Sequence, residues 1–279
     1  MRKAFPILVA LAFVIAACGP GATPSESGPS DPTATSPPPE GDAPPTMEPP
    51  TEPSPPTLTP TMEPTIPPAI IDVEIEGAAG LMLKGTFYRA TPNATPGVLM
   101  LHMYGRTRAD WDTLAKFLQS MGIACLAIDL RGHGETGGVE DWELAPQDVS
   151  AALDWLAARD DVDAEHLGAI GASIGANLSM VLGSTDRRID VIALLSPGYD
   201  YFRVSIEGAM WLYNPRPALL AASEDDAYSA DTVRGLTNEA TGQVELVIYS
   251  NAGHGNEMLV AEPDLSGLIV EFMLQFLGY

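Results

Sequence analysis

From residue 98 onward, short apolar runs alternate with longer segments of mixed polarity. The runs are nearly all apolar, as in parallel strands that are buried on both faces. They lie at 98–101, 123–128, 166–170, 191–195, 218–222 and 244–249. Helical patterns occupy 109–121, 146–159, 174–183, 228–239 and 265–276. Strands and helices in alternation predict a doubly wound α/β sheet with helices on both faces.

The segment before residue 98 has a different pattern. Residues 70–76 and 81–89 alternate apolar and polar side chains on either side of Gly-Ala-Ala-Gly at 77–80. This pattern predicts an antiparallel hairpin that opens the sheet. We therefore expect eight strands, mostly parallel, with functional residues at the carboxyl ends of the strands.

The N-terminus has the features of a targeting segment. Arg2 and Lys3 precede an apolar run at 4–17, which is short for a membrane span and typical of a signal peptide. The run ends in Ala16-Ala17-Cys18, which resembles a bacterial lipobox. That resemblance implies lipidation of Cys18, a location in the bacterial cell envelope and a folded domain outside the cytoplasm.

Residues 19–69 are rich in Pro, Thr, Ser, Gly and Glu and contain few residues that could form a core. Such a composition predicts a disordered tether with polyproline II bias. The expected organisation is a signal peptide at 1–18, the tether at 19–69 and one folded domain at 70–279. A single α/β domain is an ordinary outcome for a chain segment of that length.

Charge and cysteine content exclude several classes of protein. The formal net charge is −23, which repels phosphate backbones and disfavours nucleic-acid binding. We expect contact with a membrane only through the N-terminal anchor. Cys125 lies in an apolar run, where a buried free thiol is expected, and too few cysteines are present for a disulfide framework. No residue spacing resembles a metal site, and no cofactor is expected.

The candidate catalytic motif is Gly-Ala-Ser-Ile-Gly at 171–175. A G-x-S-x-G sequence between a strand and a helix is typical of a nucleophile elbow, in which a strained turn exposes the serine hydroxyl. Ser173 is the predicted nucleophile.

The sequence at 162–177 resembles the elbow region of the α/β-hydrolase superfamily, in its dienelactone-hydrolase-like and serine-peptidase-like branches. The resemblance extends over about 70–279. It implies the α/β-hydrolase fold and a triad in the order serine, acid, histidine. His254 directly follows the last predicted strand in a glycine-rich turn, where it could act as the general base.

The acid should follow the strand at 218–222, where the chain reads Ser223-Glu224-Asp225-Asp226. The superfamily usually has Gly-x-x-Asp there, and counting from Ser223 selects Asp226. Asp225 and Glu224 remain alternatives, because strand ends are uncertain by a few residues.

An oxyanion hole needs backbone donors, and one should be the N–H of Ile174, directly after the nucleophile. The second should come from His102-Met103-Tyr104-Gly105, which resembles the superfamily's His-Gly-x-Gly and points to Tyr104. Met103 replaces the usual glycine and is the alternative donor. We expect His102 to be structural, hydrogen-bonded beneath this loop.

About 20 residues separate the strands at 191–195 and 218–222, so a minimal cap of little more than a helix is expected. Its aromatic residues line a pocket or pack against the domain. The leading hypothesis is a monomeric serine hydrolase that cleaves small carboxylic esters through an acyl-enzyme. The alternatives are a serine peptidase or amidase that acts on short peptides, and a non-catalytic binding lipoprotein.

Overall fold

The computed structural model describes residues 69–91 and 93–278. The predicted signal peptide, the lipid anchor at Cys18 and the tether up to residue 68 lie outside the described residues and stay predictions. Ala69, expected at the end of the tether, is the first residue of a strand. Within the described part, no helix combines the length and the apolar character needed to cross a membrane.

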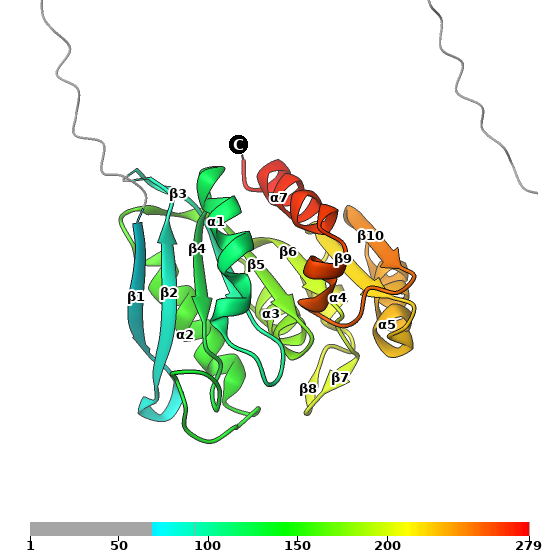
Figure 1. Cartoon of the computed structure of the whole chain (residues 1–279), viewed down its shortest axis with the longest axis horizontal. Helices are drawn as coiled ribbons and strands as arrows, with labels where there is room; N and C mark the ends of the chain where they lie inside the picture. Colours follow the sequence, from blue (N-terminus) through cyan, green and yellow to red (C-terminus); the bar gives the residue numbers. More distant parts are fainter. Residues whose placement is uncertain (1–68, 92, 279) are drawn as a thin grey trace, which may run out of the picture. The chain divides into compact units, whose positions relative to one another are not determined.

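The centre of the domain is an eight-stranded sheet in the order β1-β2-β4-β3-β5-β6-β9-β10 (Figure 1). Its first two strands are antiparallel to their neighbours, and the other strands run parallel to one another. The fold class predicted from the apolar runs is confirmed. The strands are β1 (Ala69–Glu76), β2 (Met82–Arg89), β3 (Thr95–Leu101), β4 (Ala124–Ile128), β5 (Val162–Ala172), β6 (Ile189–Leu195), β9 (Ala218–Ser223) and β10 (Val244–Tyr249).

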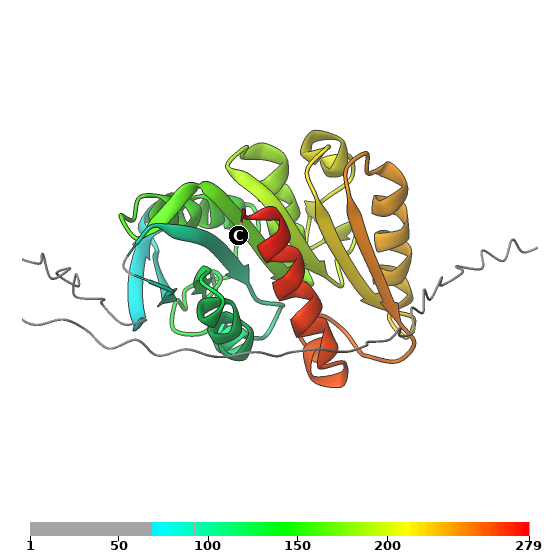
Figure 2. The same cartoon turned by 90° about the horizontal axis from the view of Figure 1, so that it is seen from above.

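Helices cover both faces of the sheet, as Figure 2 shows from above. One face carries α2 (Ala145–Ala157), α3 (Ile174–Thr185) and α5 (Ala227–Glu239), and the other carries α1 (Asp112–Ser120) and α7 (Asp264–Phe276).

Strand β3 explains why the runs are apolar throughout. Leu99 and Leu101 join the core beneath α2 and α3, whereas Val98 and Met100 join the core beneath α1 and α7. Because successive side chains of a strand point to opposite faces, a strand with two covered faces needs apolar residues at every position.

Several short elements differ from the expectation. Strand β5 starts four residues before the predicted position. The described residues also contain the 3₁₀ turns η1 (Ala78–Gly80) and η2 (Arg108–Trp111). A short helix, α6 (Glu257–Ala261), follows the turn at 251–255 that carries His254, which we call the histidine turn.

The segment between β6 and β9, which forms the cap, contains more secondary structure than the single helix that was expected. It contains a hairpin of β7 (Asp200–Tyr201) and β8 (Val204–Ser205) before α4 (Ala209–Tyr213). The hairpin turn has positive φ at Phe202 (53°) and Arg203 (71°). Such turns usually carry Gly or Asn, so this sequence contains no signal for one.

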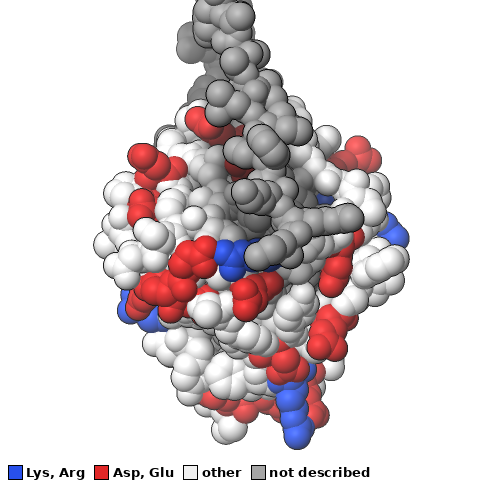
Figure 3. Space-filling model, turned by 90° about the vertical axis from the view of Figure 1, so that its right-hand side faces the viewer, with Lys and Arg blue, Asp and Glu red and all other residues white. Residues whose placement is uncertain are grey.

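The parallel strands end at one edge of the sheet. The loops after β3, β5, β9 and β10, together with the first residue of α3, carry every predicted catalytic and oxyanion-hole residue. This is the edge at which open α/β sheets bind ligands. On the face of the molecule that Figure 3 shows, acidic side chains are widespread and basic ones are few. Such a face repels polyanions.

Candidate active site

Ser173 occupies a strained turn between β5 and α3. Its backbone has φ 54° and ψ −119°, and the residue is 7% exposed. A non-glycine residue with positive φ costs free energy and persists only where the surroundings enforce it. Here the Ser173 N–H donates to the Leu195 carbonyl at 2.8 Å, which ties the turn to the end of β6. The turn has the geometry of a nucleophile elbow.

The glycines on either side of Ser173 allow close backbone approach. A Cβ on Gly171 would lie 2.1 Å from the carbonyl oxygen of Gly175. A Cβ on Gly175 would lie 2.1 Å from the Leu101 carbonyl oxygen. The start of α3 can therefore contact the end of β3 only because no side chain intervenes, and this contact sets the elbow beside residues 102–105. We call residues 102–105 the oxyanion loop after the role predicted for them.

His254 and Asp226 are hydrogen-bonded to each other. The distance from His254 Nδ1 to Asp226 Oδ2 is 2.6 Å. The other carboxylate oxygen of Asp226 accepts the Ser229 N–H at 3.3 Å and caps α5. Because Nδ1 faces the carboxylate, Nε2 of His254 is the ring nitrogen available for a substrate or a hydroxyl.

Asp225, the alternative acid, has a different partner. It accepts a hydrogen bond from the Ser223 hydroxyl, and this bond is the main reason why its pKa lies below the ordinary value. Asp225 is exposed, and the same Ser223 hydroxyl accepts the Ala252 N–H at 2.7 Å. Ser223 stands where the superfamily usually has glycine. It therefore connects the loop after β9, which carries Asp225 and Asp226, to the histidine turn.

Two residues that hold the histidine turn were not identified from the sequence. The Ser196 hydroxyl accepts the Gly255 N–H at 2.9 Å, and Ser196 itself is buried with φ 50°. A Glu257 carboxylate oxygen accepts the His254 N–H at 3.1 Å. A serine after a strand and a glutamate on a short helix belong to no motif, so only the folded chain reveals these contacts.

The histidine turn lies against both the turn at Ser173 and the oxyanion loop. A Cβ on Gly255 would lie 2.9 Å from the Met103 sulfur and 3.4 Å from the Ala172 Cβ. His254, Ser173 and the oxyanion loop are thus parts of one site, although they are far apart in the sequence.

His102 is buried beneath the oxyanion loop, as predicted. The Leu130 N–H donates to its Nε2 at 2.9 Å, so the ring proton is on Nδ1, which donates to the Met103 carbonyl at 2.7 Å. Burial lowers the pKa of His102 to about 4. The neutral ring therefore orients the Met103–Tyr104 peptide.

We expect His102 to make stability depend on pH. Its pKa of about 4 in the folded protein lies below the ordinary 6.5, so between these values the unfolded chain binds a proton that the folded chain does not. The free energy of unfolding should fall as pH drops through this window, by up to roughly 3 kcal/mol. Urea denaturation from pH 4 to pH 7.5 measures it.

The His102→Gln variant should lack this part of the pH dependence, whereas His166→Gln, at a half-exposed histidine, should keep it. Parallel curves for the wild type and His102→Gln would contradict the assignment.

Aromatic side chains form a wall beside the oxyanion loop. Phe202 of the hairpin turn stacks on Trp142, with ring centroids 5.1 Å apart and an interplanar angle of 18°, and lies 5.0 Å from the Tyr104 ring. Tyr104 and Phe202 are each 47% exposed. We call Tyr104, Trp142 and Phe202 the aromatic wall.

The aromatic residues of the cap have different surroundings, and the packing role is observed for Tyr213. Tyr201 meets the His254 ring edge-on at 6.2 Å, and Phe202 belongs to the aromatic wall. Tyr213 is buried and donates to the Pro217 carbonyl at 2.6 Å, so it packs the cap against the domain. Trp211 is 73% exposed.

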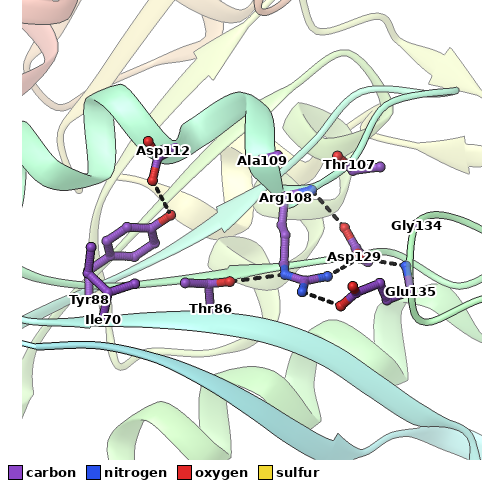
Figure 4. A pocket seen from close by; sticks show the side chains of 10 residues that line it. All are labelled: Ile70, Thr86, Tyr88, Thr107, Arg108, Ala109, Asp112, Asp129, Gly134 and Glu135. Carbon is purple, nitrogen blue, oxygen red and sulfur yellow. Dashed lines mark hydrogen bonds and ion pairs between the residues drawn. The ribbon is translucent and has the colours of Figure 1, made fainter.

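A separate cavity of about 370 Å³ lies beside β2 (Figure 4). Arg108 crosses it, forms ion pairs with Asp129 and Glu135 and donates from Nε to Thr86 at 3.0 Å. Asp129 also accepts the backbone N–H groups of Arg108 and Glu135 at 2.7 and 2.8 Å. These charges satisfy one another and hold the turn that begins at Asp129.

Comparison with known proteins agrees with this architecture. A family model described as X-Pro dipeptidyl-peptidase (S15 family) matches residues 80–269, more than half of the chain. The matched segment contains Ser173, Asp226 and His254. An uncharacterized protein of Mycobacterium tuberculosis is 26% identical over 212 residues, which are 69% of this chain and 75% of that protein.

Solved structures share the fold. A dienelactone hydrolase from Anabaena variabilis has a TM-score of 0.61 and 21% identity, with 76% of this chain and 99% of that chain covered. The esterase Pf2001 of Pyrococcus furiosus has a TM-score of 0.62 and 21% identity, with 75% and 94% covered. At this level of identity the likeness concerns the fold.

Proposed function

Because this chain belongs to the X-Pro dipeptidyl-peptidase (S15) family and has the α/β-hydrolase fold, we propose that it is a serine hydrolase that cleaves carboxylic esters. One observation carries the proposal. The strained turn at Ser173 lies at the same sheet edge as the hydrogen-bonded pair of His254 and Asp226, in the chain order that α/β hydrolases use.

In the proposed acylation step, Ser173 Oγ attacks the carbonyl carbon while His254 Nε2 takes the hydroxyl proton. Asp226 holds the imidazole by its Nδ1–H and stabilises the charged ring. The tetrahedral intermediate expels the alkoxide, which receives the proton from His254 and leaves as an alcohol. Water then attacks the acyl-enzyme with His254 as base, releasing the acid and restoring Ser173.

Backbone donors would stabilise the oxyanion. Ile174 is the first residue of α3, so its N–H has no acceptor within the helix. The Tyr104 N–H makes no loop or turn hydrogen bond to a backbone carbonyl of the described residues. Since the Met103 carbonyl points to His102, the Tyr104 N–H of the same trans peptide points to the opposite side. This orientation supports Tyr104 as the second donor and leaves the Met103 N–H as the alternative.

The aromatic wall supports an ester with an apolar acyl group. Tyr104 belongs both to the oxyanion loop and to the wall, so an acyl carbonyl bound in the hole would place its chain beside Trp142 and Phe202. Aromatic side chains of this kind are common in pockets for apolar ligands. Membership of this family supports a second candidate function, in which the same residues cleave amide bonds in short peptides.

A fluorophosphonate probe and two substrate series test the proposal. We expect the probe to modify Ser173, as read by mass spectrometry of the labelled peptide, and the folded Ser173→Ala variant to remain unlabelled. Wild-type protein should hydrolyse p-nitrophenyl esters of acetate to octanoate faster than Xaa-Pro p-nitroanilides.

Each alternative predicts a different result. Faster cleavage of the anilides would assign the protein as a peptidase. Absence of labelling in well-folded wild-type protein would overturn the hydrolase and favour a binding lipoprotein.

A further inference from the structure

Tyr201 of the cap hairpin contacts two buried serines. Its side chain is half-buried and belongs to β7. The hydroxyl shares a hydrogen bond with the Ser229 hydroxyl at 3.0 Å and lies 3.5 Å from the Ser196 carbonyl oxygen, at the long limit of a hydrogen bond. Both serines are fully buried. Burial raises the pKa of Tyr201 to about 12, so the hydroxyl stays protonated and can both donate and accept a hydrogen bond.

Each of these serines also holds one member of the proposed catalytic pair. The Ser229 N–H donates to Asp226 at 3.3 Å. The Ser196 hydroxyl accepts the N–H of Gly255, which directly follows the proposed base, at 2.9 Å. The Tyr201 hydroxyl therefore connects the cap to both ends of the hydrogen-bonded pair of histidine and aspartate.

The ring of Tyr201 packs directly on the proposed base. Its centroid lies 6.2 Å from that of the His254 ring, and the two rings meet edge-on with an interplanar angle of 85°. The Tyr201 ring also lies against the Gly198 backbone, where a Cβ would be 2.6 Å from the ring carbon Cζ. Close packing of this kind leaves the tyrosine side chain little room to move.

The hairpin that carries Tyr201 is anchored to the helix that follows the nucleophile. Asn177 of α3, four residues after Ser173, is fully buried. Its Nδ2 donates to the Val204 carbonyl at 2.8 Å, and its Oδ1 accepts the Gly198 N–H at 3.1 Å. Both sides of the hairpin are therefore tied to α3, and the position of Tyr201 is fixed relative to the elbow.

We propose that Tyr201 is a positioning residue that holds the His254 imidazole in the orientation that accepts the Ser173 proton. The inference rests on the proposed function, in which His254 is the general base. The hydrogen bond to Asp226 fixes one atom of the ring, Nδ1. A contact at a second place fixes the direction of Nε2, and small displacements of a reacting group cost large factors in rate.

The Tyr201→Phe variant removes the hydroxyl and keeps the ring. We expect its kcat for p-nitrophenyl acetate to be about fivefold lower with KM unchanged, since this factor corresponds to the loss of one ordinary hydrogen bond. Fluorophosphonate labelling of Ser173 should slow by the same factor, because it needs the same proton transfer. The proton NMR resonance of His254 Nδ1–H should also shift, which a change in cap stability alone would not cause.

Tyr228→Phe is the matched control, because it removes a hydroxyl from another tyrosine that supports the same strand. The Tyr228 ring meets the Tyr201 ring edge-on at 5.7 Å, and its hydroxyl accepts the Asp200 N–H of β7 at 2.9 Å. The control variant should keep the kcat and the His254 resonance of the wild type. It separates weaker anchoring of the hairpin from loss of the contact with the serines.

A double-mutant cycle with Ser229→Ala tests whether the hydroxyl acts through Ser229. The substitution keeps the backbone N–H that binds Asp226 and removes the partner of the Tyr201 hydroxyl. In the Ser229→Ala background, Tyr201→Phe should leave kcat nearly unchanged. If Tyr201→Phe does not fold, Ser229→Ala alone decides, with the same expected loss of kcat.

A kcat of Tyr201→Phe close to that of the wild type would overturn the proposal. So would equal losses in Tyr201→Phe and Tyr228→Phe, or an undiminished effect in the Ser229→Ala background. Hydrolysis of p-nitrophenyl acetate and labelling of the wild type separate this failure from failure of the proposed function. If the wild type shows both activities, only the role of Tyr201 is wrong. If it shows neither, the hydrolase itself is wrong.

Discussion

Replacing Asp226 by asparagine should lower kcat for p-nitrophenyl esters by about 10⁴-fold, the order seen when a triad acid is neutralised with its shape kept. The introduced amide would still offer an oxygen to cap α5, but its NH₂ group would face His254 Nδ1 and favour the wrong ring tautomer. Steady-state kinetics with the p-nitrophenyl ester that the wild type hydrolyses fastest measures the effect.

Asp225→Asn is the matched control, because it makes the same chemical change at the preceding residue. Asp225 is exposed and bonds to Ser223, so its replacement should change kcat only a few-fold. If Asp225→Asn gave the large loss and Asp226→Asn the small one, the acid would be Asp225.

Gly175→Ala should destabilise the domain by about 3 kcal/mol or more. The added Cβ would lie 2.1 Å from the Leu101 carbonyl oxygen and 2.7 Å from that of His102. Both are backbone atoms at the end of β3, so neither can rotate away as a side chain would. The start of α3 must then move, and with it the elbow. Urea denaturation followed by circular dichroism measures the loss.

Gly267→Ala provides the control for this substitution. Gly267 lies inside α7, and a Cβ there meets no atom within 4 Å. Alanine is a better helix former than glycine, so this variant should gain about 0.5 to 1 kcal/mol. Equal effects at Gly175 and Gly267 would contradict the assigned role of the close approach at the elbow.

Spacing along the chain could not decide which acid of the loop after β9 contacts His254. Ser223, Glu224, Asp225 and Asp226 are adjacent, and the motif selected Asp226 only by counting from Ser223. In the structure, Asp226 reaches the His254 ring, whereas Asp225 bonds to Ser223. The difference depends on how the chain turns after β9, which local sequence does not encode strongly.

The aromatic wall illustrates a second limit of prediction from the sequence. Trp142, Tyr104 and Phe202 come from three separate segments, and the turn that carries Phe202 lacks the glycine or asparagine that normally indicates such a hairpin.

The sequence by itself determined the order along the chain of the eight strands of the main sheet and of the long helices, and the position of the elbow. Strands with two covered faces must be apolar at every position, and the turn at Ser173 needs glycines on both sides. Both requirements produce local residue patterns, and such patterns can be recognised in the sequence. Only the tertiary structure decided which acid meets His254 and which side chains surround the site. Those contacts join residues far apart in the chain, and they form only when the strand ends are brought to one edge of the sheet.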